Sequence, residues 1–124
     1  MKLVWLTDPH FRDTPQFGHD SRIRLSAAIG YVNMHHADAA LCVISGDIAD
    51  IPTRENYANV ASLLGTLPMP YLPLTGNHDE RAEFAQHLPL PADRMEGFIQ
   101  YSVTQNGLRI IALDSLYEGD EDGA

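Results

Sequence analysis

Three short segments of this sequence carry side chains that could bind a metal ion. They are Asp8-Pro9-His10, Gly46-Asp47-Ile48-Ala49-Asp50 and Gly76-Asn77-His78-Asp79. Carboxylate, imidazole and amide groups in this mixture suit Mn²⁺, Fe or Zn²⁺ rather than a thiolate site. Each of the first two segments, taken alone, has a plain structural explanation, because Asp also closes turns and caps helices. Turn chemistry gives no reason for the histidine of the third segment, so the three together predict a metal site.

Each segment directly follows a short apolar run that is typical of a buried strand. The runs cover residues 2–6, 39–45 and 71–74. Two segments of helical period lie between them. The first can begin at an N-cap of Asp20 or Ser21, and the second at an N-cap of Thr53. A third, shorter helix is expected from Asp79 to about His87.

Short apolar strands that alternate with amphipathic helices predict βαβ units and a mostly parallel sheet, which is an α/β fold. The carboxyl ends of parallel strands lie at one edge of the sheet, where ligands bind. Gly46 and Gly76 allow the chain to leave its strand sharply, so that the next side chain can face the crevice. We therefore expect three strands to bring their metal-competent side chains to one edge.

The last part of the chain has a different pattern. Residues 98–104 and 108–113 form two segments separated by Gln105-Asn106-Gly107. Asn-Gly is the strongest short-range signal for a two-residue turn, so these segments predict a C-terminal hairpin. The remaining residues 118–124 are acidic and rich in turn formers.

Composition limits the partners and the compartment. The 124 residues include 8 basic and 17 acidic side chains, a net charge of −9. Phosphate backbones repel such a chain, so we expect no binding to duplex nucleic acid, and bound divalent cations would supply the charge for handling phosphate. No apolar run approaches the roughly 20 residues of a membrane span, so no membrane partner is expected. The single Cys42 fits a reducing, cytoplasmic compartment.

In their order, the three metal-competent segments resemble the motifs of the calcineurin-like metallophosphoesterases. The flanking residues resemble the branch with cyclic-nucleotide phosphodiesterases and glycerophosphodiesterases. These residues are Gly18-His19-Asp20, Arg22, Leu25, Tyr57, Arg81 and Ala112-Leu113-Asp114-Ser115. The resemblance implies the N-terminal half of a four-layer αββα sandwich, a single phosphoesterase domain over residues 1–124 that is truncated after the strand ending near Asp114.

The same resemblance implies a binuclear centre of two divalent ions, Mn, Fe or Zn. Asp8 and His10 would bind the first ion, Asp47 would bridge the two, and Asn77 would bind the second. A metal-bridging hydroxide would attack a phosphodiester such as a cyclic nucleotide or a glycerophosphodiester.

Four further residues receive roles from the resemblance. His78 would face the oxygen of the leaving group, and Asp79 would orient the His78 ring. Arg81 could reach the phosphate or the leaving group, with a solvated residue at a helix start as the alternative. His19 could line the crevice, because it lies close to the first segment, or it could be a solvated histidine.

The chain also departs from the family pattern. That pattern continues with a lone His and a Gly-His-x-His segment, and no histidine follows His87 here. The first metal site would be partial and the second weak, because affinity follows the number of ligands. A sheet face without the later strands would be exposed and apolar, which predicts self-association or a partner. Three functions are kept open: an incomplete phosphodiesterase, a non-catalytic metal-binding or dimerising half-domain, and a plain α/β interaction module whose motifs are relics.

Overall fold

A computed structural model describes residues 1–15 and 18–117 of the chain. Its centre is a parallel sheet of three strands in the order β1-β2-β3. The strands are β1 (Leu3–Thr7), β2 (Leu41–Ser45) and β3 (Tyr71–Leu74). They alternate with the helices α1 (Ser21–His35), α2 (Arg54–Leu64) and α3 (Arg81–His87). An antiparallel hairpin, β4 (Tyr101–Gln105) and β5 (Leu108–Ala112), follows. The predicted α/β fold with a C-terminal hairpin is confirmed.

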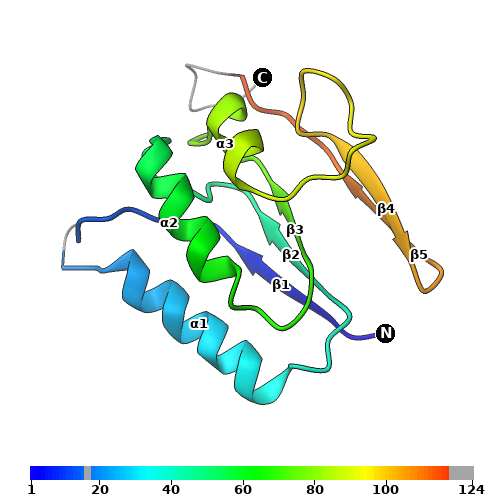
Figure 1. The fold of residues 1–124 in the computed structure, drawn as a ribbon, viewed down its shortest axis with the longest axis horizontal. Helices are drawn as coiled ribbons and strands as arrows, with labels where there is room; N and C mark the ends of the chain where they lie inside the picture. Colours follow the sequence, from blue (N-terminus) through cyan, green and yellow to red (C-terminus); the bar gives the residue numbers. More distant parts are fainter. Residues whose placement is uncertain (16–17, 118–124) are drawn as a thin grey trace.

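The helices cover one face of the parallel sheet, and the hairpin lies beyond β3 (Figure 1). Both crossovers move in the same direction along the sheet, from β1 to β2 and from β2 to β3. Because such crossovers are right-handed, α1 and α2 must lie on the same side of the sheet. All three parallel strands therefore end at one edge, and the loop after each strand begins there.

The helix starts agree with the expected caps in two of three cases. The Asp20 side chain accepts hydrogen bonds from the backbone of α1, and the Thr53 side chain does the same for α2. The third helix does not begin at Asp79 as expected. It begins at Arg81, because the Glu80 side chain is the N-cap and accepts from the first turn of α3.

The hairpin has the expected turn but a shorter first strand. Asn106 and Gly107 have φ angles of 52° and 80°, the left-handed conformation that a two-residue Asn-Gly turn requires. The first strand was expected from residue 98 and begins at Tyr101 instead. The backbone of Phe98 and that of Gln100 are hydrogen-bonded to Met95, so residues 98–100 belong to the preceding loop.

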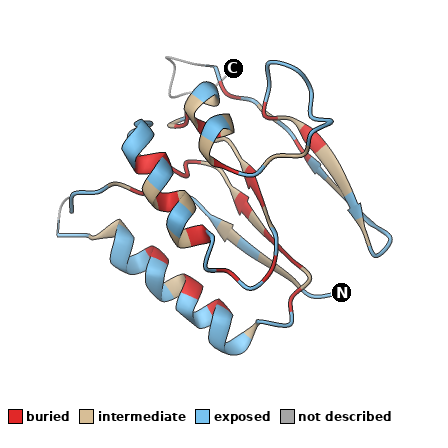
Figure 2. Ribbon diagram, in the orientation of Figure 1, coloured by how far each residue is buried: buried red, intermediate tan, exposed pale blue. Residues whose placement is uncertain are grey.

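The core lies between the sheet and the helices, where buried side chains gather (Figure 2). Tyr57 and Phe84 join α2 to α3 through an edge-to-face contact, with ring centroids 5.8 Å apart. On β1, by contrast, the side chain of Trp5 is 70% exposed. Within the residues that the structure describes, no helix has both the length and the apolar character needed to cross a lipid bilayer.

Candidate metal centre

The first two loops at the strand ends run side by side because the pairing of β1 with β2 continues beyond the strands. The backbone N–H groups of His10 and Phe11 donate to the carbonyl oxygens of Asp47 and Ile48, each over 2.9 Å. The backbone N–H of Asp50 donates to the carbonyl oxygen of Phe11 over 3.0 Å. This backbone ladder brings the first two predicted segments together at the edge of the sheet.

The third loop packs directly onto Asp47. The backbone N–H of His78 donates to Asp47 Oδ1 over 2.8 Å. A Cβ atom at Gly76 would lie 2.3 Å from both the backbone nitrogen and Oδ1 of Asp47, which no real Cβ tolerates. Position 76 therefore needs glycine for this close approach. Asn77, a predicted ligand, lies between these two residues and its side chain is exposed.

Three predicted ligands adopt a backbone conformation that ordinary residues avoid. The φ angles of Asp8, His10 and Asp47 are 52°, 45° and 48°. Among the non-glycine residues in the described part of the chain, only Asn106 in the hairpin turn shares this property. Left-handed backbone outside a turn costs free energy and is typical of functional sites, where the surrounding structure enforces it. The strain therefore singles out the same residues as the sequence does.

The His10 ring is oriented by Asp50. His10 Nδ1 lies 2.9 Å from Asp50 Oδ1. A carboxylate accepts hydrogen bonds, so Nδ1 carries a proton, and Nε2 is the ring nitrogen that can bind an ion. Nε2 faces two other carboxylates, 3.4 Å from Asp47 Oδ2 and 3.7 Å from Asp8 Oδ1. A carboxylate behind the ring and a lone pair in front of it is the usual arrangement of a metal-binding histidine.

Two groups of side chains have the spacing that an ion requires. Asp8, His10 and Asp47 form one, and His10, Asp50 and His78 form the other, with the ligand atoms of each group within 4.8 Å of one another. Three carboxylate or imidazole ligands with open positions are a common protein share of a catalytic metal site. The residues therefore fit a divalent cation, and the first group fits best because Asp50 is engaged behind His10.

His78 lies beside this group with its ring held by backbone. The rings of His10 and His78 meet edge to face at 5.1 Å between centroids. His78 Nδ1 is 3.2 Å from the carbonyl oxygen of Asp50, which can only accept. The proton therefore sits on Nδ1, and Nε2 is left to take up or release a proton.

Asp79 does not orient the His78 ring as expected. Its buried carboxylate accepts hydrogen bonds from the backbone N–H groups of Ile48, Ala49 and Gly76 and from the Tyr57 hydroxyl. Burial raises the pKa of the Asp79 carboxyl, and these hydrogen bonds oppose the rise. With these four hydrogen bonds Asp79 joins the second and third loops to α2. The carbonyl oxygen of Asp50, rather than Asp79, contacts the His78 ring.

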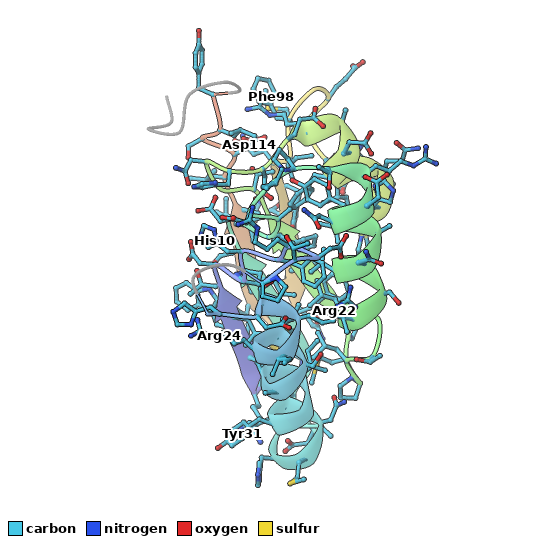
Figure 3. All side chains as sticks on the ribbon, turned by 90° about the vertical axis from the view of Figure 1, so that its left-hand side faces the viewer. His10, Arg22, Arg24, Tyr31, Phe98 and Asp114 are labelled. Carbon is cyan, nitrogen blue, oxygen red and sulfur yellow. The ribbon has the colours of Figure 1, made fainter. Side chains whose placement is uncertain are left out.

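Arg81 also takes a place that the sequence did not suggest. Its guanidinium binds the carboxylate of Asp114 through two hydrogen bonds, of 2.8 and 3.0 Å, and lies over the Phe98 ring. Phe98 and Asp114 lie together at one end of the molecule, away from Arg24 and Tyr31 (Figure 3). The sequence offered a contact with phosphate or a solvated side chain for Arg81. In the structure Arg81 instead neutralises the buried carboxylate of Asp114.

A cleft of about 290 Å³ opens beside the first group of ligands. It is lined by Asp8, Pro9, His10, Arg12, His19, Ser21, Arg24 and Asp50. His19 does line the crevice, as one of the two sequence interpretations held. Figure 3 shows Arg24 on the same side of the molecule as His10.

The sequence assigned no role to three of the residues that build this site. Asp50 was part of the second segment, and its spacing of three from Asp47 was the available signal. Arg12 and Arg24 gave no signal, because an arginine in a loop or on a helix is ordinary. Their place beside the ligands follows from the fold alone.

Comparison with known proteins agrees with this geometry. A model of the calcineurin-like phosphoesterase family matches residues 1–121. A probable cyclic nucleotide phosphodiesterase of Rhodopseudomonas palustris is 40% identical over 121 residues, which cover 95% of this chain and 44% of that protein.

Two further relatives are more distant. A probable cyclic nucleotide phosphodiesterase of Fibrobacter succinogenes is 26% identical over 93% of this chain and 45% of its own length. The glycerophosphodiester phosphodiesterase GpdQ of Enterobacter lignolyticus is 28% identical over 99% of this chain and 46% of its own length. The chain thus spans less than half the length of these relatives. Because the family model matches residues 1–121 of the chain, the chain belongs to the calcineurin-like phosphoesterase family.

Proposed function

We propose that this chain supplies the metal-binding edge of a hydrolase that cleaves phosphodiesters. One observation carries the proposal: Asp8, His10 and Asp47 come from two loops, share left-handed backbone, and bring their ligand atoms within 4.8 Å of one another. A backbone strained at each of these ligands is hard to explain by packing. Family membership gives the reaction class, because the chain belongs to the calcineurin-like phosphoesterases.

The proposed substrates are small phosphodiesters of the cyclic-nucleotide or glycerophosphodiester type. This class rests on the relatives, which are named for cyclic nucleotides and for a glycerophosphodiester. The acidic composition points the same way, since a net charge of −9 disfavours a polynucleotide.

We assign the roles of the site as follows. Asp8, His10 and Asp47 hold one divalent ion, and Asn77 contributes to a second, weaker site. Bound divalent ions neutralise the phosphate charge and lower the pKa of water. His78, whose Nε2 is free of the backbone, exchanges a proton with the oxygen of the leaving group. Asp79 is a positioning residue for the loop that carries His78.

The first test separates metal binding from turnover. Calorimetric titration with Mn²⁺ should show binding to the wild type, loss of binding in His10→Ala, and no change in His87→Ala, a histidine on α3 outside the site. Hydrolysis of bis-p-nitrophenyl phosphate is then assayed in this chain and in a fusion to the C-terminal part of the Rhodopseudomonas relative. A fusion that folds and binds Mn²⁺ but stays inert with Mn²⁺, Fe²⁺ and Zn²⁺ would rule out the catalytic role.

A second candidate function is a metal-binding half-domain that pairs with another copy of itself. The large exposed apolar side chains of Trp5, Ile111 and Leu113 favour it, with exposed fractions of 70%, 62% and 64%. Sedimentation equilibrium should then show a dimer that Trp5→Gln converts to a monomer. A wild type that is monomeric at all concentrations would exclude this alternative.

A further inference from the structure

We propose that Arg24, steadied by His19 and accompanied by Arg12, forms a subsite that binds the oxyanion of a phosphate ester in the cleft beside the metal ligands. The inference rests on the proposed function and gives a role to Arg12 and Arg24, to which neither the motifs nor the comparisons assign one. It is carried by the cleft, by the contact between Arg24 and His19, and by the charged residues that line the cleft.

The contact between Arg24 and His19 fixes the chemistry of one wall. Arg24 Nη2 lies 2.7 Å from His19 Nδ1. A guanidinium can only donate, so Nδ1 of His19 must accept and its proton must sit on Nε2. Both side chains therefore present N–H donors, and neither presents an acceptor. The contact also links the loop before α1 to the first turn of that helix, which limits where the guanidinium can lie.

Arg12 adds a second guanidinium to the cleft. Its Nε atom is buried and has no hydrogen-bond acceptor among the described residues, and Asp50 Oδ2 is the nearest ion-pair partner at 3.5 Å. Because that atom is buried, Arg12 contributes to the cleft the positive charge of its guanidinium rather than its Nε donor.

Charges of both signs line the cleft. Asp8 and Asp50 line it with His10, Arg24 lines it with His19, and Arg12 lies beside Asp50. A divalent ion beside His10 would neutralise the carboxylates and leave the arginines in excess. The planar fork of a guanidinium matches the oxygens of a phosphate ester in geometry and charge. With an ion bound, the cleft therefore fits an anionic, oxygen-rich ligand.

The decisive experiment measures binding rather than turnover. Mn²⁺-loaded protein is titrated with dimethyl phosphate, a phosphodiester that resists hydrolysis, and Mn²⁺ affinity is measured separately for each variant. Arg24→Ala should weaken dimethyl phosphate at least tenfold, as expected for the loss of a charged hydrogen bond, while Mn²⁺ affinity stays unchanged. Alanine at an exposed position of α1 is a good helix former, so the variant should fold.

Arg22→Ala is the matched control. Arg22 lies on the same helix, and its replacement by alanine changes the net charge by the same amount. Its guanidinium contacts Asp13 and the Phe11 ring and does not line the cleft. It should change dimethyl phosphate affinity less than twofold. Equal losses in Arg22→Ala and Arg24→Ala would reduce the effect to bulk charge and overturn the inference.

The conservative variants sharpen the test. Arg24→Lys keeps the charge without the fork and should bind between the wild type and Arg24→Ala. His19→Ala should weaken dimethyl phosphate about threefold and His19→Gln, which keeps an acceptor for Arg24, should restore most of that loss.

The outcomes separate the inference from the proposed function. Unchanged dimethyl phosphate affinity in Arg24→Ala, with Mn²⁺ bound, overturns the subsite alone. Arg24-dependent binding of dimethyl phosphate in a protein whose fusion hydrolyses nothing supports the subsite and removes the catalytic function. A wild type that binds no Mn²⁺ overturns both.

Discussion

Two sets of aspartates, Asp79 alone and the pair of Asp8 and Asp47, lie within the same three loops and have different partners. The carboxylate of Asp79 is buried and accepts hydrogen bonds from three backbone N–H groups and a tyrosine hydroxyl. Asp8 and Asp47 instead turn oxygen atoms toward His10 Nε2, and Asp47 also accepts one hydrogen bond, from the backbone N–H of His78. The first set is saturated with donors from the protein, and the second gathers around one imidazole.

This difference shows how a structural carboxylate can be told from a ligand. Carboxylates that face one another across a single imidazole repel each other, and a cation among them removes that repulsion. A saturated carboxylate stabilises the fold with or without an ion. Substitutions in the first set should therefore act on stability, and substitutions in the second on metal binding.

The largest loss of stability is expected from Asp79→Ala. It would leave four donors unsatisfied, Tyr57 among them, so the free energy of unfolding should fall by about 4 kcal/mol. Urea denaturation measures the loss. Asp79→Asn, which keeps one acceptor oxygen, should lose less. An alanine variant as stable as the wild type would erase the distinction between the two sets.

Gly76→Ala should come next. The added Cβ would collide with the backbone and carboxylate of Asp47, so we expect a loss of about 3 kcal/mol and weaker Mn²⁺ binding in the same variant. Thermal unfolding and calorimetry measure the two effects. Gly18→Ala gives a glycine control at an uncrowded position, although its positive φ adds a small cost of its own. Full Mn²⁺ affinity in Gly76→Ala would contradict the packing of the third loop against Asp47.

Arg81→Ala tests the second saturated carboxylate, Asp114. The side chain of Asp114 is fully buried, and the loss of its guanidinium partner should cost about 2 kcal/mol. Mn²⁺ affinity should not change, because the pair lies outside the cleft. Chemical denaturation with a parallel Mn²⁺ titration checks both parts. A selective loss of Mn²⁺ binding would instead place Arg81 in the site.

Acid should weaken the same pair. Burial raises the pKa of Asp114, but hydrogen bonds from Arg81 and from two backbone N–H groups outweigh it, so the pKa lies below the ordinary 3.8. A carboxyl with a lowered pKa in the folded state stabilises above its unfolded value and loses this contribution as the pH falls through the folded one. Unfolding free energy measured from pH 6 to pH 2 should fall more steeply below pH 3.8 in the wild type than in Arg81→Ala.

The smallest change in stability is expected from Asp8→Asn. Asparagine tolerates left-handed backbone, and the substitution removes one of the facing negative charges, so the metal-free protein should change by less than about 0.5 kcal/mol. Mn²⁺ affinity should nevertheless fall at least tenfold. Thermal scans with and without Mn²⁺ measure both, and a large loss of stability without metal would put Asp8 among the structural carboxylates.

Much of this fold could be predicted from the sequence. The strands, two of the helix caps and the Asn-Gly turn depend on local patterns, and each formed close to where it was expected. The three segments at the strand ends were likewise expected at one edge, because parallel strands share a direction. The start of α3 was misplaced because aspartate is by residue type a better N-cap than glutamate, and only the fold shows that Asp79 is needed elsewhere.

The partners of charged side chains could not be predicted in this way. Arg81 binds Asp114, 33 positions further along the chain, and Arg24 lies in the cleft because α1 begins beside the first loop. Such pairs depend on where the elements pack and not on spacing. The orientation of His10 by Asp50 belongs to the same class, since it required the register of the two loops.

The single imidazole of His10 belongs to both groups of possible ligands. His10 Nε2 can bind an ion together with Asp8 and Asp47 while Nδ1 keeps its proton toward Asp50. Binding an ion through Nδ1 instead, together with Asp50 and His78, would require Nδ1 to lose that proton. The two arrangements therefore compete for one ring, so only one of these two groups can hold a cation at a time.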